Sequence, residues 1–415
     1  MDRVARRGGP KFWTVLDQAL VSGSNFVLTL LLFRLLGIDN FGVYALFFVV
    51  LTIAQTIHHS AVSTPMMSIL PGPEAAAHER EIAHFLVFHL IVNLPLSLVA
   101  TAALRIAAGP AIGPVEAIAT FLALALFQFH DFVRRYLFSA EKAFYGFLAD
   151  GLRYLSLLVA VGLALALLPG DQRVALALWL TAAASLLSVL LMGGMVLRAA
   201  DIGAPGLRAA LARYARLSSW LGFSGALQVL SSSIFYLVAG GLLTPAAAGI
   251  LRASQTATSI LPVMQQGLET YVPMRAAQHF RAAGRDGLAG FLRQSFLQAF
   301  AFALIVGLLL VIFADPLMAL LFPGDLAGTN LVFWFVIIAL VEVLVSYIRF
   351  YFRSVLDVAP VFWASAASAL VAMGLVYPLV SQMGLVGAAL GILAARIALL
   401  SVLVLFLVRR LRRPA

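Results

Sequence analysis

Long apolar stretches, separated by short polar or glycine- and proline-containing breaks, follow one another along almost all of this 415-residue chain. A helix needs about 20 predominantly apolar residues to cross the hydrocarbon core of a membrane. Eleven breaks therefore predict an all-α integral membrane protein with about twelve transmembrane helices. The breaks fall at residues 37–40, 71–74, 109–110, 141–142, 169–171, 200–216, 243–245, 281–286, 323–325, 357–360 and 381–383.

The composition excludes several classes of protein. Hydrophobic residues make up 62% of the chain and charged residues 11%, whereas about 25% of residues are charged in a soluble domain. Because the chain has no cysteine, disulfides, thiolate metal sites and cysteine nucleophiles are excluded. The seven histidines show no zinc-site spacing. We therefore predict no metal site and no cofactor.

The basic residues predict the orientation of the chain. With the N-terminus placed in the cytoplasm, all but six of the 28 Lys and Arg residues fall in cytoplasmic segments, and Arg134, Arg135 and Arg349 belong to this cytoplasmic set. Such a bias predicts that both termini are cytoplasmic, and it explains the net charge of +10 without nucleic acid. The six exceptions are Arg105 and Arg173 in outer loops and Arg34, Arg153, Arg252 and Arg396 within spans.

Weak internal similarity divides the chain into two halves. Gln18-Ala19-Leu20 is echoed by Gln228-Val229-Leu230, and Thr64-Pro65-Met66 by Val272-Pro273-Met274. We predict two six-helix bundles in the same orientation, at residues 1–198 and 215–415, joined by a cytoplasmic linker at residues 199–214. Transporters built from such repeats bind their substrate between the halves.

Polar residues form stripes on the early spans of both halves. At 100° per residue, the first span presents Gln18, Ser22 and Asn25 on one face, and the eighth presents Arg252, Thr256 and Gln266. Helix packing accounts for a single serine or threonine, but polar stripes on both halves predict a hydrated central cavity. We expect the substrate to contact Arg252, Arg396, Gln18, Ser22, Asn25, Thr256, Gln266 and Arg153.

Charged residues within spans are further candidates. Glu342 and Arg396 both lie near the middle of a span, so they face either each other or water. Asp150 and Arg153 are spaced for a local ion pair, and Asp131 is close to two arginines. Arg34 lies opposite the polar stripe and is expected to extend to the membrane interface. The candidates for ion coupling are Glu342, Glu269 and Asp17.

Several short motifs resemble a known family. Ser22-Gly23-Ser24-Asn25-Phe26, Arg34-Leu35-Leu36-Gly37 and Phe41-Gly42-Val43-Tyr44 resemble the start of polysaccharide flippases, as do Arg134-Arg135-Tyr136-Leu137 and Asp150-Gly151-Leu152-Arg153-Tyr154 further on. These flippases translocate O-antigen and exopolysaccharide repeat units. They belong to the multidrug, oligosaccharidyl-lipid and polysaccharide exporter (MOP) superfamily.

The resemblance implies a function and a location. It implies that a polyprenyl-pyrophosphate-linked oligosaccharide is moved from the cytoplasmic to the outer leaflet by alternating access, for surface polysaccharides including lipopolysaccharide. It implies a multi-pass protein of the bacterial inner membrane whose partners are the lipid-linked oligosaccharide and membrane lipids. An association with a polysaccharide polymerase or other assembly proteins is left open.

Two alternatives remain on sequence grounds. A cation-coupled drug or small-molecule antiporter of the same superfamily needs a carboxylate within a span, which the chain provides. A membrane polysaccharide polymerase or glycosyltransferase is disfavoured, because the outer loops are short and carry no cluster of carboxylates or histidines. We therefore predict a transporter rather than an enzyme.

Overall fold

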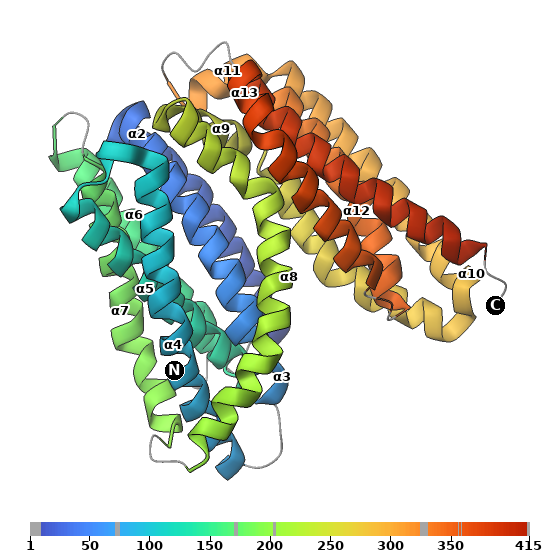
Figure 1. Ribbon diagram of the computed structural model, residues 1–415, viewed down its shortest axis with the longest axis horizontal. Helices are drawn as coiled ribbons and strands as arrows, with labels where there is room; N and C mark the ends of the chain where they lie inside the picture. Colours follow the sequence, from blue (N-terminus) through green and yellow to red (C-terminus); the bar gives the residue numbers. More distant parts are fainter. Residues whose placement is uncertain are drawn as a thin grey trace. The chain divides into compact units, whose positions relative to one another are not determined.

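A computed structural model describes residues 10–70, 75–169, 173–201, 205–323, 331–355, 357 and 359–412. All regular structure in these ranges is helical, which agrees with the predicted all-α class (Figure 1). The chain forms two compact units, residues 1–226 and 227–415.

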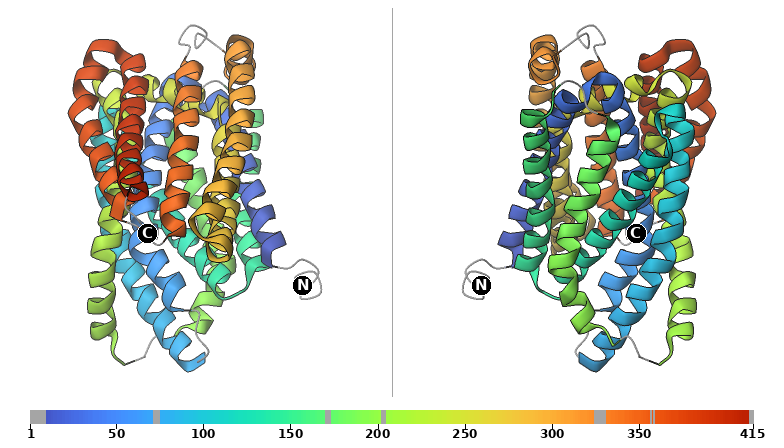
Figure 2. Two further views of the ribbon diagram at one scale, coloured as in Figure 1. Left: turned by 90° about the vertical axis from the view of Figure 1, so that its right-hand side faces the viewer. Right: turned by 90° about the vertical axis from the view of Figure 1, so that its left-hand side faces the viewer.

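The first unit is a bundle in which α2 packs along α4 and α6, while α5 packs along α7 (Figure 2). Its core includes Phe85, Phe132 and Tyr214, and the rings of Phe85 and Tyr214 stack at 4.1 Å. Burial raises the pKa of Tyr214, whose hydroxyl donates to Glu81. The elements are α2 (Pro10–His58), the π-helix η1 (His59–Ser63), α3 (Thr64–Ile69), α4 (Ala75–Ala108), the 3₁₀ helix η2 (Gly109–Ala111), α5 (Pro114–Ser139), α6 (Ala143–Leu167), α7 (Val174–Ala199) and part of α8 (Leu207–Leu242).

In the second unit, α12 packs against both α10 and α13. Phe235, Phe350 and Phe352 are fully buried in it. Pro245 begins α9 with its fixed φ, and the Thr244 hydroxyl caps the first turn by accepting from the Ala247 amide at 3.2 Å. The elements are the remainder of α8, α9 (Pro245–Ala257), α10 (Ile260–Ile312), α11 (Ala314–Leu321), α12 (Leu331–Ser354) and α13 (Ala359–Leu411).

Glycines break the three longest helices. The backbone φ is 66° at Gly37 in α2, 62° at Gly284 in α10 and 57° at Gly384 in α13, a region that glycine adopts without steric cost. Unbroken, the 53 residues of α13 would extend about 80 Å, far beyond a hydrocarbon core of about 30 Å. Two of the breaks lie where the sequence predicts them, and Gly384 lies one residue beyond residues 381–383.

Nine helices in the described part of the chain are long and apolar enough to cross a membrane. Two of the three missing spans are accounted for because residues 12–67 and 359–410 each form one stretch across a glycine break. The third is the predicted eighth span, which is divided between α9 and the start of α10 and is not among the nine. The helix α8 begins at Leu207, inside the predicted linker at residues 199–214. The predicted breaks at 71–74, 170–171 and 324–325, and both chain ends, lie outside the described residues.

Candidate functional site

A buried charge network crosses three helices of the first unit. The guanidinium of Arg134 in α5 donates to both Asp17 of α2 and Asp150 of α6. The side chains of both aspartates are only 2% exposed. A buried carboxylate without a partner is strongly destabilising, so this one cation holds three helices together.

The network continues through His130, one turn before Arg134 on α5. His130 Nε2 lies 2.9 Å from Asp150 Oδ1, and Nδ1 lies 2.9 Å from Ser188 Oγ on α7. The single proton of the Ser188 hydroxyl goes either to the Ala149 carbonyl or to His130 Nδ1. When it goes to Nδ1, a neutral imidazole protonated at Nε2 donates to Asp150; when it goes to Ala149, Nδ1 donates to Ser188 and the contact of Nε2 with Asp150 takes a second proton. The network can therefore hold one exchangeable proton inside the bundle.

The expected local pair of Asp150 with Arg153 does not form. Asp150 contacts Arg134 and His130 instead, because both extend toward it from α5. Arg153 is 4% exposed and donates from Nε to Ser185 Oγ at 3.1 Å. Its guanidinium lies over the rings of Phe127 and Tyr154 at 4.4 and 4.5 Å.

Asp131 forms the local pair that the sequence predicts. Its carboxylate accepts from Arg135 Nε at 2.7 Å, one helical turn away. The other carboxylate oxygen accepts from Gln55 Nε2 of α2 at 3.3 Å. The orientation argument assigns Arg134 and Arg135, among others, to cytoplasmic segments. Both lie within α5 and pair with carboxylates of the bundle.

A second network lies in the second unit. Glu342 of α12 accepts from Arg349, two turns further along the same helix, and lies 3.3 Å from Arg396 of α13. Glu269 of α10 is 3.6 Å from Arg349. The side chains of Glu342 and Arg396 are each 18% exposed and that of Arg349 7%. Two guanidiniums therefore converge on one carboxylate that is accessible from outside the helices.

Glu342 and Arg396 thus face each other, which is one of the two arrangements predicted from their positions near the middle of a span. Sequence reasoning missed Arg349, which the orientation argument places in a cytoplasmic segment although its side chain is buried within α12. The spacing of seven residues from Glu342 was the available signal, because residues two turns apart share one helix face.

The polar stripe of α2 lies on an accessible side of that helix. Gln18 is exposed, Ser22 and Asn25 are half-buried, and Gln18 Nε2 donates to Ser22 Oγ at 3.2 Å. Asp17 is buried and pairs with Arg134, so it does not belong to the stripe.

The corresponding stripe of the second unit is less uniform. Arg252 donates to Gln255 Oε1 at 3.2 Å. Thr256 is buried, and its hydroxyl donates to the Arg252 carbonyl, whereas Gln266 is exposed. These residues remain predicted substrate contacts, with Thr256 the least accessible of the three.

No model of a known protein family matches the chain, and no curated protein matches its sequence. Solved structures do match its fold. An inward-facing multidrug resistance MATE family transporter of the MOP superfamily aligns with a TM-score of 0.75 at 14% identity, over 97% of this chain and 98% of that one. The lipid II flippase MurJ, in an inward closed conformation, aligns with a TM-score of 0.68 at 10% identity, over 96% and 87%.

A third similar structure is a MOP superfamily transporter from Pyrococcus furiosus, described as having a binding pocket of reverse polarity, with a TM-score of 0.61 at 15% identity over 98% and 97% of the two chains. At these identities the similarity establishes the fold. The chain therefore has the fold of MATE-type transporters and of MurJ, and its long apolar helices are those of a multi-pass membrane protein.

Proposed function

We propose that the protein is a flippase that moves a polyprenyl-pyrophosphate-linked oligosaccharide from the cytoplasmic to the outer leaflet by alternating access, for surface polysaccharide synthesis. The observation that carries this proposal is the convergence of Arg349 and Arg396 on Glu342 in the second unit. Similarity to a lipid II flippase supports it at the level of the fold.

The chemistry of the substrate matches this convergence. Arginine binds phosphate oxygens through paired, charge-assisted hydrogen bonds. In the unloaded protein Glu342 and Glu269 together balance the two guanidiniums, and an incoming pyrophosphate takes over their donors. The amide groups of Gln18, Asn25 and Gln266 and the hydroxyl of Ser22 contact the sugars, and the polyprenyl tail stays in the lipid.

The proposed topology gives this site its setting. Division of the long helices at Gly37, Gly284 and Gly384 yields twelve crossings with both termini in the bacterial cytoplasm. The proposed six-helix bundles comprise residues 1–198 and 215–415. Membrane lipids and polysaccharide assembly proteins are the proposed partners in the inner membrane.

Proton coupling is the proposed energy source. The network of Asp17, Arg134, Asp150 and His130 can hold one proton in addition to the arginine charge. Release of that proton changes the charge of the His130–Asp150 pair and turns the Ser188 hydroxyl toward His130 Nδ1, which favours a different packing of α5 against α6. A proton gradient can thereby bias the two conformations of the transporter.

A second candidate is a cation-coupled drug antiporter. Similarity to multidrug resistance MATE transporters favours it. The carboxylates Glu342 and Glu269 of the second network also favour it, because a cation-coupled antiporter needs an acidic group within a span.

Reconstitution tests the proposal directly. In proteoliposomes, we expect the purified protein to translocate a fluorescent polyprenyl-pyrophosphate-linked oligosaccharide. Arg396→Ala should lower the rate more than about tenfold, because a hydrogen bond to a charged group contributes about 1.5–3 kcal/mol. The control is Arg34→Ala, which removes an exposed arginine of α2. Equal rates for the two variants would refute the site, and proton-driven efflux of a cationic drug without flipping would favour the antiporter.

Cysteine labelling tests whether the stripes line water. Because the chain has no cysteine, a single cysteine at Gln18, Asn25 or Thr256 is the only thiol present. We expect a water-soluble maleimide to label positions 18 and 25 readily and 256 more slowly, as their burial indicates. Absence of labelling at all three positions, in every transport condition, would exclude the hydrated cavity.

A further inference from the structure

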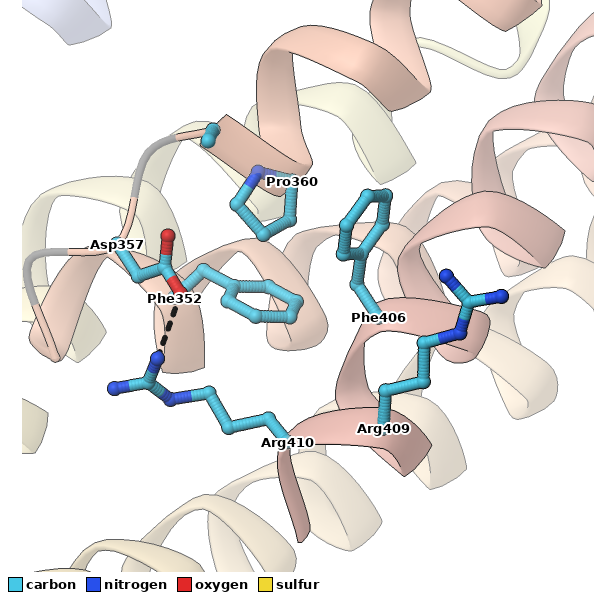
Figure 3. Close-up of a pocket in the computed structure, with 7 residues that line it drawn as sticks. Phe352, Asp357, Pro360, Phe406, Arg409 and Arg410 are labelled. Atoms are coloured by element: carbon cyan, nitrogen blue, oxygen red, sulfur yellow. Dashed lines mark hydrogen bonds and ion pairs between the residues drawn. The ribbon is translucent and has the colours of Figure 1, made fainter. Parts of the chain in front are cut away.

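A cavity of about 220 Å³ lies at one end of the second unit, where α12 ends and both ends of α13 meet (Figure 3). The break at Gly384 folds α13 back on itself, which brings its first turn beside its last. The lining residues are Phe352, Asp357, Ala359, Pro360, Phe406, Arg409 and Arg410.

The cavity combines two guanidiniums with a single carboxylate. Arg410 Nη1 donates to Asp357 Oδ2 at 2.9 Å, as the dashed line in Figure 3 marks. The Nε of Arg410 is buried and has no hydrogen-bond partner among the residues that the structure describes. Within those residues Arg409 takes part in no ion pair. Among the lining residues, the positive charge of Arg409 is therefore not balanced by a carboxylate, and the buried Nε–H of Arg410 has no acceptor.

The remaining walls are apolar. Phe352, Pro360 and Phe406 lie together, and the guanidinium of Arg410 extends toward Asp357 while that of the exposed Arg409 extends on the other side of Phe406 (Figure 3). The cavity has room for several water molecules, since about 10–15 Å³ of such space holds one, which suits a phosphate group with a short organic substituent. The last turn of α13 ends an apolar stretch that runs to Arg410, so the cavity lies at the level of lipid head groups.

We propose that this cavity binds the phosphate of an anionic phospholipid. Arg409 and Arg410 bind the phosphate oxygens, and the aromatic walls contact the glycerol and the first methylenes of the acyl chains. Basic pockets between transmembrane helices bind anionic head groups in this way. The site is separate from Glu342 and does not depend on the proposed transport function.

Native mass spectrometry of the purified full chain tests the site, with phosphatidylglycerol as the ligand and phosphatidylcholine as the neutral comparison. We expect preferential retention of phosphatidylglycerol. Arg409→Gln should weaken it about fivefold, the effect of one basic residue at an anionic surface. The matched control is Arg412→Gln, which removes an exposed arginine of the same segment that does not line the cavity.

Asp357→Asn separates binding from a purely structural role. This substitution removes the anion that competes for Arg410, so phosphatidylglycerol should bind more tightly, whereas Arg410→Gln should bind it more weakly. If both variants lose the lipid equally, the pair is structural and the proposal fails. It fails as well if Arg409→Gln and Arg412→Gln behave alike, or if millimolar inorganic phosphate displaces phosphatidylglycerol completely, which would identify a soluble phosphate as the ligand.

Discussion

His130 of α5 and Asp150 of α6 lie 2.9 Å apart, from Nε2 to Oδ1, in a part of the first unit where both side chains are almost fully buried. Ser188 Oγ contacts the other ring nitrogen and either accepts or donates there, because its hydroxyl can turn between His130 Nδ1 and the Ala149 carbonyl. The pair can therefore take up one proton beyond that of a neutral imidazole.

Replacing Asp150 should remove the proton dependence of transport. Asp150→Asn keeps the shape of the side chain, and its amide donates to His130 Nε2 without an exchangeable proton. We expect the variant to fold, and we expect its transport rate in proteoliposomes to be unchanged by an imposed pH gradient that accelerates the wild-type protein. A gradient response equal to that of the wild type would assign the coupling proton to another group.

Arg134 should contribute more to stability than an exposed arginine. Arg134→Met leaves Asp17 and Asp150 buried without their cation, which costs about 3–5 kcal/mol. The comparison is Arg213→Met, because Arg213 is 52% exposed and its pair with Glu81 is worth at most about 1 kcal/mol. Thermal melting in detergent should show a much larger decrease for Arg134→Met. Similar melting temperatures for the two variants would mean that water reaches the aspartates.

The imidazoles of His58 and His89 form a second buried contact, with Nε2 of His58 2.8 Å from Nδ1 of His89. Asn93 Nδ2 lies 3.4 Å from His89 Nε2 and donates to it, so His89 donates to His58. His89→Leu leaves the buried Nε2 of His58 without its donor, which lowers the free energy of unfolding by about 1–3 kcal/mol.

The double variant His58→Leu/His89→Leu should recover part of that loss, because replacing both partners with apolar groups removes the unsatisfied acceptor. Chemical denaturation of the wild type, both single variants and the double variant gives the coupling energy. Additive losses would show that the two rings do not depend on each other.

Two glycines of α13 should respond to alanine in opposite directions. A Cβ at Gly391 would overlap the ring of Phe235, which is fully buried, whereas a Cβ at Gly374 would meet no atom within 4 Å. We expect Gly391→Ala to destabilise by about 1–3 kcal/mol through overpacking. Gly374→Ala should be neutral or stabilise by up to about 1 kcal/mol. Melting temperatures measured side by side check the ranking, and a stabilised Gly391→Ala would contradict the close approach of α8 and α13.

Local features of the sequence predicted the helices well. Gly37 marks a break because glycine permits a positive φ, and Thr244-Pro245 marks a helix start because proline fixes φ and threonine caps the first turn. No distant contact is needed to recognise either signal. The pair of Asp131 with Arg135 was also predictable, since one helical turn separates them.

The partners in the charge networks were not predictable in the same way. Asp17 and Arg134 are 117 positions apart, and only the packing of α2 and α5 around α6 brings them together. Arg349 was missed as a member of its network for another reason. The excess of arginines in cytoplasmic segments reports the depth of a residue along the membrane normal, but it does not report whether the side chain points out of the bundle or into it.

The turn at Gly384 also determines how far the two ends of α13 move when the angle between its segments changes. The segments of α13 on either side of it, residues 359–383 and 385–411, are each about 38 Å long at 1.5 Å per residue. A change of about 5° in the angle between them moves their far ends by about 3 Å, close to the length of one hydrogen bond. A small torsional change at Gly384, which has no side chain, can thereby bring Pro360 and Arg410 together or separate them.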